Sequence, residues 1–353
     1  MSIVGAFDVH RRQLTFDYLD TATGEVKAGR VVPADREHLR AWLARFAGHD
    51  DVHFALEGCT GWRHVAEELA AAGIIAHLAE PADTAALRGN KRHAKTDKTD
   101  ARHLRVHLLA GDLPECWIPP EHVLGARAVV RLYKDLRDER GGWHQRIAAT
   151  FIKGIPVSAS MDTAEGRAAA LTMDLSPAGR QAVDTGLRQI DRLTGELEPL
   201  RRQPGCAALR ATQFGAGPVT SVAIWAELGD VRRFGNSDDV VCHTGLDITV
   251  YSSDGKRSAG HLSRQGPQLL RWALYKAAKC AARPAAPDYR YYAAIRDRRT
   301  SGLATLSVAR KLARRCYHTL RELGEEALPP AAKGTACTRR RARTPMNRGR
   351  LLR

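Results

Sequence analysis

The sequence contains no apolar run of about eighteen residues, the length from which a membrane-spanning helix is suspected. Residues 1–5 also lack the basic segment and the long apolar stretch that a secretory signal requires. We therefore expect a soluble protein without a membrane partner. Its expected location is the cytoplasm, in association with the nucleoid.

Cysteine and aromatic residues are both sparse. The cysteines form no Cys-x-x-Cys pair and no close group with histidine, so the pattern indicates neither a disulfide framework nor a zinc site. We interpret them as reduced and mostly buried thiols. They are Cys59, Cys116, Cys206, Cys242, Cys280, Cys316 and Cys337. An aromatic content of 6% favours binding to the backbone of structured duplexes over stacking on single strands.

Acidic residues are outnumbered by basic ones, and the formal net charge is +16 with a pI near 9.9. A charge of this sign and size points to a polyanionic partner. Residues 331–353 hold Lys333 and seven arginines without any acid. Such a segment, here part of a basic tail over 326–353, is expected to be disordered and to contact nucleic acid, with Arg339, Arg340 and Arg341 as candidates. A merely solubilising tail is the alternative.

The first 120 residues alternate between patterns typical of strands and of helices. Three strands in a meander come first, and helix and strand then alternate, which predicts a mixed sheet with helices on its faces and an α/β fold class. The expected strands cover 3–9, 13–20, 26–32, 52–56 and 74–78, and the expected helices cover 35–46, 62–72 and 101–110.

Beyond residue 120 the patterns are mainly helical. Two long stretches, 122–152 and 178–203, predict a helical linker over 121–203, which either dimerises as a coiled coil or only joins two domains. A mainly α-helical domain is expected over 204–325. It contains a glycine-rich turn at 214–218 that opens a helix, a loop at 251–260 and a helix over 267–282.

Four carboxylates occupy positions that suit a metal site. Asp8 ends the first strand and Glu57 directly follows the strand at 52–56, so both lie at one edge of the sheet if these strands are neighbours. Asp97 and Asp100 are three residues apart at a helix start and share one face. Together they suit Mg²⁺ or Mn²⁺, which take carboxylate oxygens, water and phosphate as ligands. Helix capping and simple solvation are the structural alternative.

Basic residues surround these acids and are expected to grip phosphates. They are Arg88, Lys91, Arg92, Lys95, Lys98, Arg102 and Arg105.

Three sequence blocks resemble those of the DEDD insertion-sequence transposases, relatives of the Piv-type invertases. The blocks are Phe-Asp-Val-His at 7–10, Ala-Leu-Glu-Gly-Cys-Thr-Gly at 55–61 and Lys-Thr-Asp-Lys-Thr-Asp-Ala at 95–101. The similarity continues at 113–120 and over 204–320. It implies a RuvC-like, RNase H-like domain over 1–120, a transposase domain over 204–325, and catalytic and metal-binding roles for Asp8, Glu57, Asp97 and Asp100.

The resemblance also implies a serine nucleophile. In the family, a serine in a Ser-Gly step of the second domain is thought to attack DNA, and the matching segment here makes Ser253 the first candidate and Ser252 the second. Asp254 stands where the family more often has a glycine. A hydroxyl needs activation, and the resemblance implies that the metal site supplies it once the domains close across a dimer. Nearby expected nucleic-acid contacts are Lys256, Arg257, Arg264 and Arg271.

The function that the resemblance implies is that of a DNA transposase or recombinase, which cuts and rejoins DNA through a 5′-phosphoserine intermediate. Its implied partners are DNA, a structured guide (bridge) RNA encoded by the element, and further copies of the chain in a dimer or tetramer. Two alternatives remain open. One alternative is a metal-dependent junction-resolving nuclease that uses water. The other is a catalytically decayed nucleic-acid-binding protein.

Overall fold

A computed structural model describes residues 2–88, 96–150, 160–201, 207–249, 251–253, 256–258 and 260–328. These residues form two compact units, which divide between Ile118 and Pro119. Several predictions lie outside the described residues, namely those for Lys91, Arg92, Lys95, Asp254, the three tail arginines Arg339, Arg340 and Arg341, and the segment 331–353. Within the ranges given, the structure has no helix long and apolar enough to cross a membrane.

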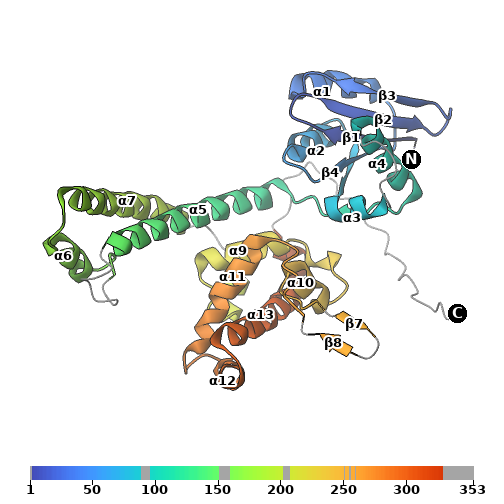
Figure 1. Cartoon of the computed structure of the whole chain (residues 1–353). Coiled ribbons are helices and arrows are strands. Elements are labelled where there is room, and N and C mark those ends of the chain that lie inside the picture. Colours follow the sequence, from blue (N-terminus) through green and yellow to red (C-terminus); the bar gives the residue numbers. More distant parts are fainter. Residues whose placement is uncertain are drawn as a thin grey trace. The chain divides into compact units, whose positions relative to one another are not determined.

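The first unit is built on a six-stranded sheet with the order β3-β2-β1-β4-β5-β6 (Figure 1). β1, β2 and β3 form the expected antiparallel meander, β4 and β5 run parallel to β1, and β6 is antiparallel to β5. The prediction of a mixed sheet is therefore confirmed. The strands are β1 Ile3–Val9, β2 Leu14–Asp20, β3 Val26–Val31, β4 Val52–Glu57, β5 Ile75–Ala79 and β6 Glu115–Cys116.

The two faces of this sheet carry side chains of different size, because successive residues of a strand point to opposite faces. One face is aromatic: Phe7, Phe16 and Phe54 pack with Trp42 in a single core cluster. This core includes residues of α1 (Arg36–Leu43), which begins at its cap Asp35, and of α2 (Trp62–Ala71). A short helix, α3 (Pro81–Leu87), follows β5. It was not predicted.

The opposite face carries small side chains and receives α4 (Asp97–Ala110). Val4, Ala6, Ala55 and Ala79 pack there against Leu104 and Leu108 of this helix. Small side chains on the sheet let the helix approach closely. α4 begins four residues before the predicted stretch 101–110, so Asp97 and Asp100 both lie in its first turn.

A buried ion pair fixes α4 to the sheet. Arg105 is 6% exposed and its Nε donates to Oδ1 of Asp17 on β2, which is 2% exposed. From the sequence, Arg105 is expected to grip phosphates together with the other basic residues around the carboxylates. That interpretation is wrong, because the guanidinium is buried against its partner and does not face solvent.

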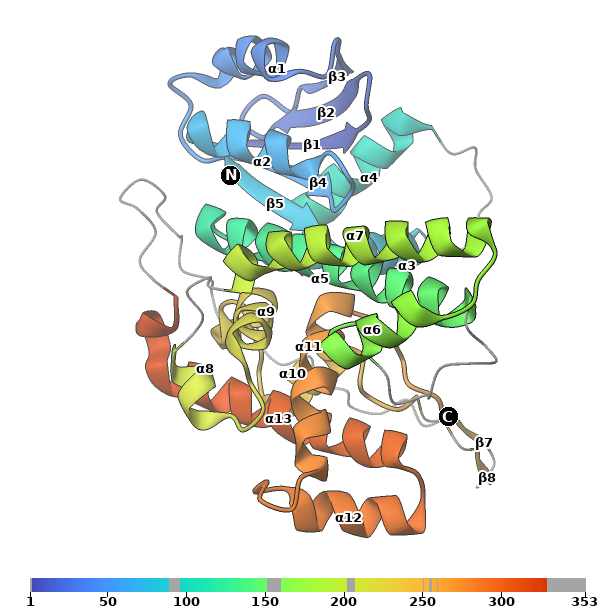
Figure 2. The same ribbon diagram turned by 90° about the vertical axis from the view of Figure 1, so that its left-hand side faces the viewer.

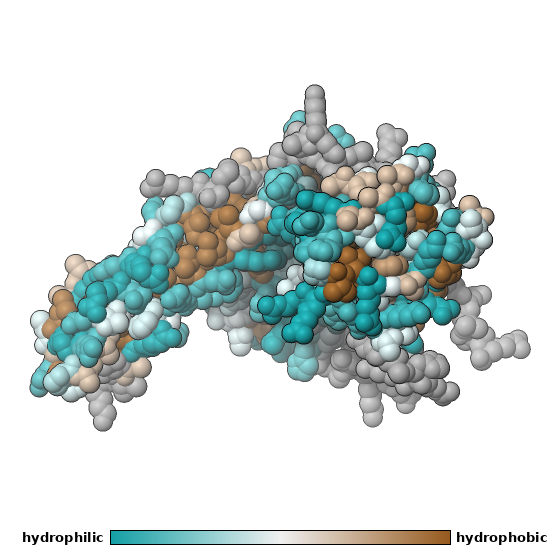
Figure 3. Space-filling model, turned by 90° about the horizontal axis from the view of Figure 1, so that it is seen from above, coloured by the Kyte–Doolittle hydropathy of each residue, from teal (hydrophilic) through white to brown (hydrophobic). Residues whose placement is uncertain are grey.

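The second unit is helical. α5 and α7 lie side by side as a long hairpin, with α6 at its far end (Figures 1 and 2). Ile147 of α5 and Val183, Leu187 and Ile190 of α7 form its core. Figure 3 shows hydrophilic side chains over most of this arm, interrupted by an apolar band. The helices are α5 Glu121–Thr150, α6 Ala164–Thr172, α7 Pro177–Arg201, α8 Ala207–Thr212, α9 Pro218–Leu228, α10 Ser237–Thr244, α11 Gln268–Ala278, α12 Tyr289–Arg298 and α13 Ser301–Leu323.

The body of this unit is a helical core to which α13, among others, contributes many buried side chains. Leu312, Ala313, Cys316 and Tyr317 of α13 are each at most 2% exposed. α9 begins at Pro218 after the glycine-rich turn, as predicted, whereas the helix expected over 267–282 ends at Ala278 and continues as a 3₁₀ turn. The loop expected over 251–260 contains two short strands, β7 (Tyr251–Ser253) and β8 (Lys256–Ser258).

Removing one partner of the buried ion pair between Arg105 and Asp17 should cause a large loss of stability. Asp17→Ala leaves the Arg105 charge buried without its carboxylate, and the free energy of unfolding should fall by about 3 kcal/mol. Chemical denaturation of the full chain measures this. Arg102→Ala is the matched control, since Arg102 is exposed on the same helix and its loss should cost less than about 0.5 kcal/mol.

Replacing both partners by Asp17→Leu with Arg105→Met should restore most of that stability, because no unpaired buried charge is then left. Equal unfolding curves for wild type and Asp17→Ala would contradict the anchoring role of the pair.

Candidate active site

Asp8 and Glu57 lie at the same edge of the sheet. β1 and β4 are parallel neighbours, and the last paired residues in their register are Phe7 and Leu56, so Asp8 and Glu57 come next on their strands. Phe7 and Leu56 belong to the aromatic core on one face. Because side chains alternate, Asp8 and Glu57 follow on the face that α4 covers.

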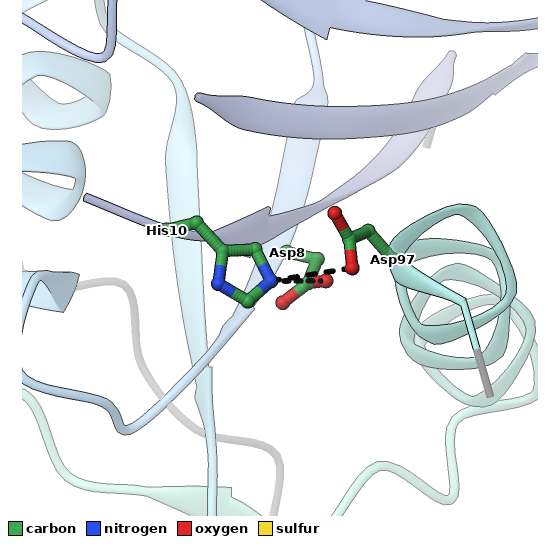
Figure 4. Close-up of side chains that lie close together, drawn as sticks. All are labelled: Asp8, His10 and Asp97. Carbon is green, nitrogen blue, oxygen red and sulfur yellow. Dashed lines mark hydrogen bonds and ion pairs between the residues drawn. The ribbon is translucent and has the colours of Figure 1, made fainter. Parts of the chain in front are cut away.

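The first turn of α4 brings a third carboxylate to this edge. Thr96 caps the helix, since its Oγ1 accepts from the amide of Thr99 at 3.2 Å. Asp97 then faces Asp8 across a short gap, with His10 beside them (Figure 4). One ligand atom from each of Asp8, His10 and Asp97 lies within 4.8 Å of the other two.

His10 joins the two aspartates. Its Nε2 lies 3.1 Å from Oδ2 of Asp8 and 3.5 Å from Oδ1 of Asp97. Gln13 holds the other oxygen of Asp97, because its Nε2 donates to Oδ2 at 2.8 Å. Asp8 is 14% exposed, whereas Asp97 is 39% and His10 51% exposed, so the group opens to solvent on the side of Asp97 and His10.

The electrostatics of this edge favour a bound cation. Burial raises the pKa of Asp8 above its usual value, His10 opposes that rise, and the charges of Asp100 and Asp97 add to it. Negative charges that raise one another's pKa are stabilised by an added positive charge. Asp100 also pairs with Arg88, whose Nη1 lies 3.2 Å from Oδ1.

In the second unit, the candidate serines lie at the end of a β-ribbon. Ser253 pairs with Lys256 and Ser252 with Arg257, so Ser253 is the last paired residue of β7. Nearer the helices, Ile248 and Leu262 form an isolated antiparallel bridge.

The base of this ribbon is fixed by close backbone approach. Gly245 ends α10 with a φ of +66°, and a Cβ at that position would lie 2.3 Å from the Gln265 oxygen. Only glycine fits there without a shift of the backbone. Arg271 links the two sides, since its Nη1 donates to Gly266 O at 2.9 Å and to Thr244 O at 3.3 Å.

Two transposase family models match separate segments of the chain. A transposase model of the DEDD IS110 type matches residues 5–155, and a model described as the transposase IS116/IS110/IS902 family matches residues 207–293. The chain is similar to DEDD transposases of the IS110 type in both segments. The candidate carboxylates fall in the first matched segment and the candidate serines in the second.

A relative from Pseudomonas aeruginosa, described as a probable family 20 transposase, is 28% identical to the chain over 104 residues. The alignment covers 28% of this chain and 31% of the relative. The chain thus spans about a third of the length of the curated relative that it matches.

The family suggests a divalent metal, and the residues at the sheet edge fit one. An octahedral ion with bonds of about 2.1 Å holds adjacent ligand atoms about 3 Å apart, close to the spacings around His10 Nε2. Carboxylate oxygens are the ligands that Mg²⁺ and Mn²⁺ prefer. Among the described residues, the group within 4.8 Å holds Asp8, His10 and Asp97, while Glu57 and Asp100 lie outside it.

His10 and Gln13 are the site residues that sequence reasoning did not single out. A signal for His10 was present, because it stands two residues after Asp8 and alternation places both on one side of the strand. Gln13 gave no such signal. It reaches Asp97 because the chain turns back after β1 and re-enters the sheet at Leu14.

The predicted nucleic-acid contacts fall into different environments. Lys98, Arg102 and Arg264 are exposed, as a phosphate contact requires. Arg88 is engaged with Asp100, and Arg271 with the base of the ribbon. Lys256 and Arg257 lie on β8, opposite the two serines.

His243, near the base of the ribbon, predicts a pH dependence of stability. Burial, reinforced by the charge of Arg233, lowers its pKa from 6.5 to about 4. The unfolded chain therefore binds a proton at this residue between pH 6.5 and 4 where the folded chain does not. The free energy of unfolding should fall as the pH is lowered through that window, by at most about 3 kcal/mol.

Denaturation of the second unit at a series of pH values measures this slope. His243→Gln should flatten it, and the control His261→Gln, at an exposed ribbon position, should leave it unchanged. A slope that persists in His243→Gln would contradict the assignment.

Proposed function

We propose that this chain is a DNA transposase that cuts and rejoins DNA, with a divalent metal held by Asp8 and Asp97 and completed by Glu57 and Asp100. The observation that carries the proposal is the approach of Asp97 on α4 to Asp8 on β1, two residues 89 positions apart that belong to one family-matched segment. The first unit is then an RNase H-like, RuvC-like catalytic domain. Its mixed sheet and the match of residues 5–155 to the DEDD transposase model support that assignment.

When bound, Mg²⁺ or Mn²⁺ supplies positive charge that stabilises the attacking and leaving oxygens of a phosphodiester. Asp8 and Asp97 orient this charge at the sheet edge. The exposed Lys98 and Arg102 lie on the same helix as Asp97 and bind neighbouring phosphates of DNA. Arg88 keeps the Asp100 carboxylate in place through its ion pair.

Ser253 acts as the nucleophile in this proposal, with Ser252 as the second candidate. Its Oγ forms a bond to phosphorus while the bond to the 3′ oxygen breaks, and the serine proton is lost as the 3′ hydroxyl gains one. The product is a 5′-phosphoserine link. A free DNA 3′ hydroxyl later attacks the same phosphorus and releases the serine, so the energy of the phosphodiester is conserved. The position of Ser253 at the end of the ribbon supports access to DNA.

The proposal extends to partners. The family resemblance suggests a structured guide RNA from the element itself, and a dimer or tetramer in which the metal site of one copy activates the serine of another. The high net charge supports binding to two kinds of nucleic acid. Dimerisation through the hairpin of α5 and α7 is part of the same proposal, and Leu132 on α5, 49% exposed, is a candidate contact.

A second candidate is a metal-dependent nuclease that uses water. One observation favours it: Asp8, His10 and Asp97 form their group within the first unit alone, without a serine. In that case no covalent link between protein and DNA forms.

Trapping the reaction separates these candidates. The full chain is incubated with DNA carrying the ends of its element, RNA transcribed from the flank and Mg²⁺, and is then denatured and searched for DNA-linked peptide by mass spectrometry. We expect an adduct at Ser253 in wild type. It should vanish in Ser253→Ala, Asp8→Asn and Asp97→Asn, and persist in Ser252→Ala and in the control Ser258→Ala on the opposite strand.

Metal-dependent cleavage without any adduct would establish the nuclease instead. Binding without cleavage would identify a catalytically decayed protein. If the adduct is lost only in Ser252→Ala, the nucleophile is Ser252 and not Ser253.

A further inference from the structure

His10 lies where a third metal ligand would be. It follows β1 directly, two residues after Asp8, and its Nε2 points into the space between Asp8 and Asp97 (Figure 4). The ring is 51% exposed, so no packing against the core forces it into that position. Its nitrogen Nε2 contacts the carboxylates of Asp8 and Asp97.

The distances suit coordination as well as pairing. Nε2 is 3.1 Å from one aspartate oxygen and 3.5 Å from the other. Adjacent ligands of an octahedral ion stand about 3 Å apart and opposite ones about 4.2 Å apart when the bonds are about 2.1 Å. All three ligand atoms lie within 4.8 Å of one another, and this spacing leaves room for one ion between them.

Asp97 is oriented for one-oxygen coordination. Its Oδ2 accepts the hydrogen bond from Gln13, which leaves Oδ1 on the side of His10. A hydrogen bond to the outer oxygen of a ligating carboxylate fixes its rotation, and such outer partners set metal affinity. Gln13 is thus a positioning residue for the same ion.

We propose that His10 is a metal ligand through Nε2, together with Asp8 and Asp97, and that it makes this site prefer Mn²⁺ to Mg²⁺. Mg²⁺ takes oxygen ligands at near-ideal geometry, whereas an imidazole nitrogen suits transition metals. Water and a DNA phosphate complete the shell. This inference rests on the proposed function for the presence of a metal, and it adds a residue outside the four acids as well as a metal preference.

Pulsed electron paramagnetic resonance of the Mn²⁺-loaded full chain tests the inference directly. A coordinated imidazole modulates the Mn²⁺ echo through its ¹⁴N nucleus, and wild type should show this modulation. His10→Gln removes the imidazole at an exposed position and should abolish it. The control His38→Gln removes another exposed imidazole, which lies on α1 and pairs with Asp35. This variant should keep the ¹⁴N modulation.

Competition between Mn²⁺ and Mg²⁺ gives the second readout. His10→Gln should lower the ratio of the Mn²⁺ affinity to the Mg²⁺ affinity by about tenfold, since one nitrogen ligand is lost. Gln13→Ala should weaken both ions alike and leave that ratio unchanged.

The outcomes distinguish this inference from the proposed function. Mn²⁺ that binds to wild type and is lost in Asp8→Asn, but shows no ¹⁴N modulation, would overturn the role of His10 and leave the carboxylate site standing. Absence of Mn²⁺ binding to wild type in the presence of DNA would overturn both. An unchanged affinity ratio in His10→Gln would overturn the metal preference.

Discussion

The close packing of α4 against the small-residue face of the sheet is the constraint on which the proposed site of the first unit depends. Val4, Ala6, Ala55 and Ala79 leave room for the helix, and Leu104 and Leu108 fill it. The buried ion pair of Arg105 with Asp17 then fixes where along the sheet the helix lies. Without this docking, Asp97 would have no reason to meet Asp8. The proposed metal site is in this sense a consequence of packing, since one aspartate comes from a strand and the other from a helix that only tertiary contacts position.

This origin explains how much of the site could be read from the sequence. Asp8 and Glu57 follow apolar strands, and the expectation that they share an edge needed only parallel pairing of β1 with β4, which the structure has. The spacing of Asp97 and Asp100 needed only a helix start. The burial of Arg105 could not be predicted in this way, because it depends on which face of α4 packs against the sheet. A basic residue among other basic residues gives no local indication of that face. Gln13 likewise contacts Asp97 through a turn whose path no periodicity encodes.

The serine ribbon shows a second limit of sequence reasoning. Strands of three residues, Tyr251–Ser253 and Lys256–Ser258, are too short to show an alternating pattern among polar residues. At the base of the ribbon, the backbone at Gly245 approaches Gln265 so closely that a side chain would clash. The family resemblance, and not the local pattern, singled out Ser252 and Ser253. The register now gives each serine a cross-strand neighbour, a lysine or an arginine, whose charge suits a nearby phosphate.

The proposed function requires the sheet edge of the first unit to hold a metal between β1 and α4. Crystals of the full chain soaked in Mn²⁺ and measured above and below the manganese absorption edge test this directly. An anomalous peak is expected at bonding distance from Asp8 Oδ2, Asp97 Oδ1 and His10 Nε2. A peak at another place in the chain, or no peak there at saturating Mn²⁺, would contradict it.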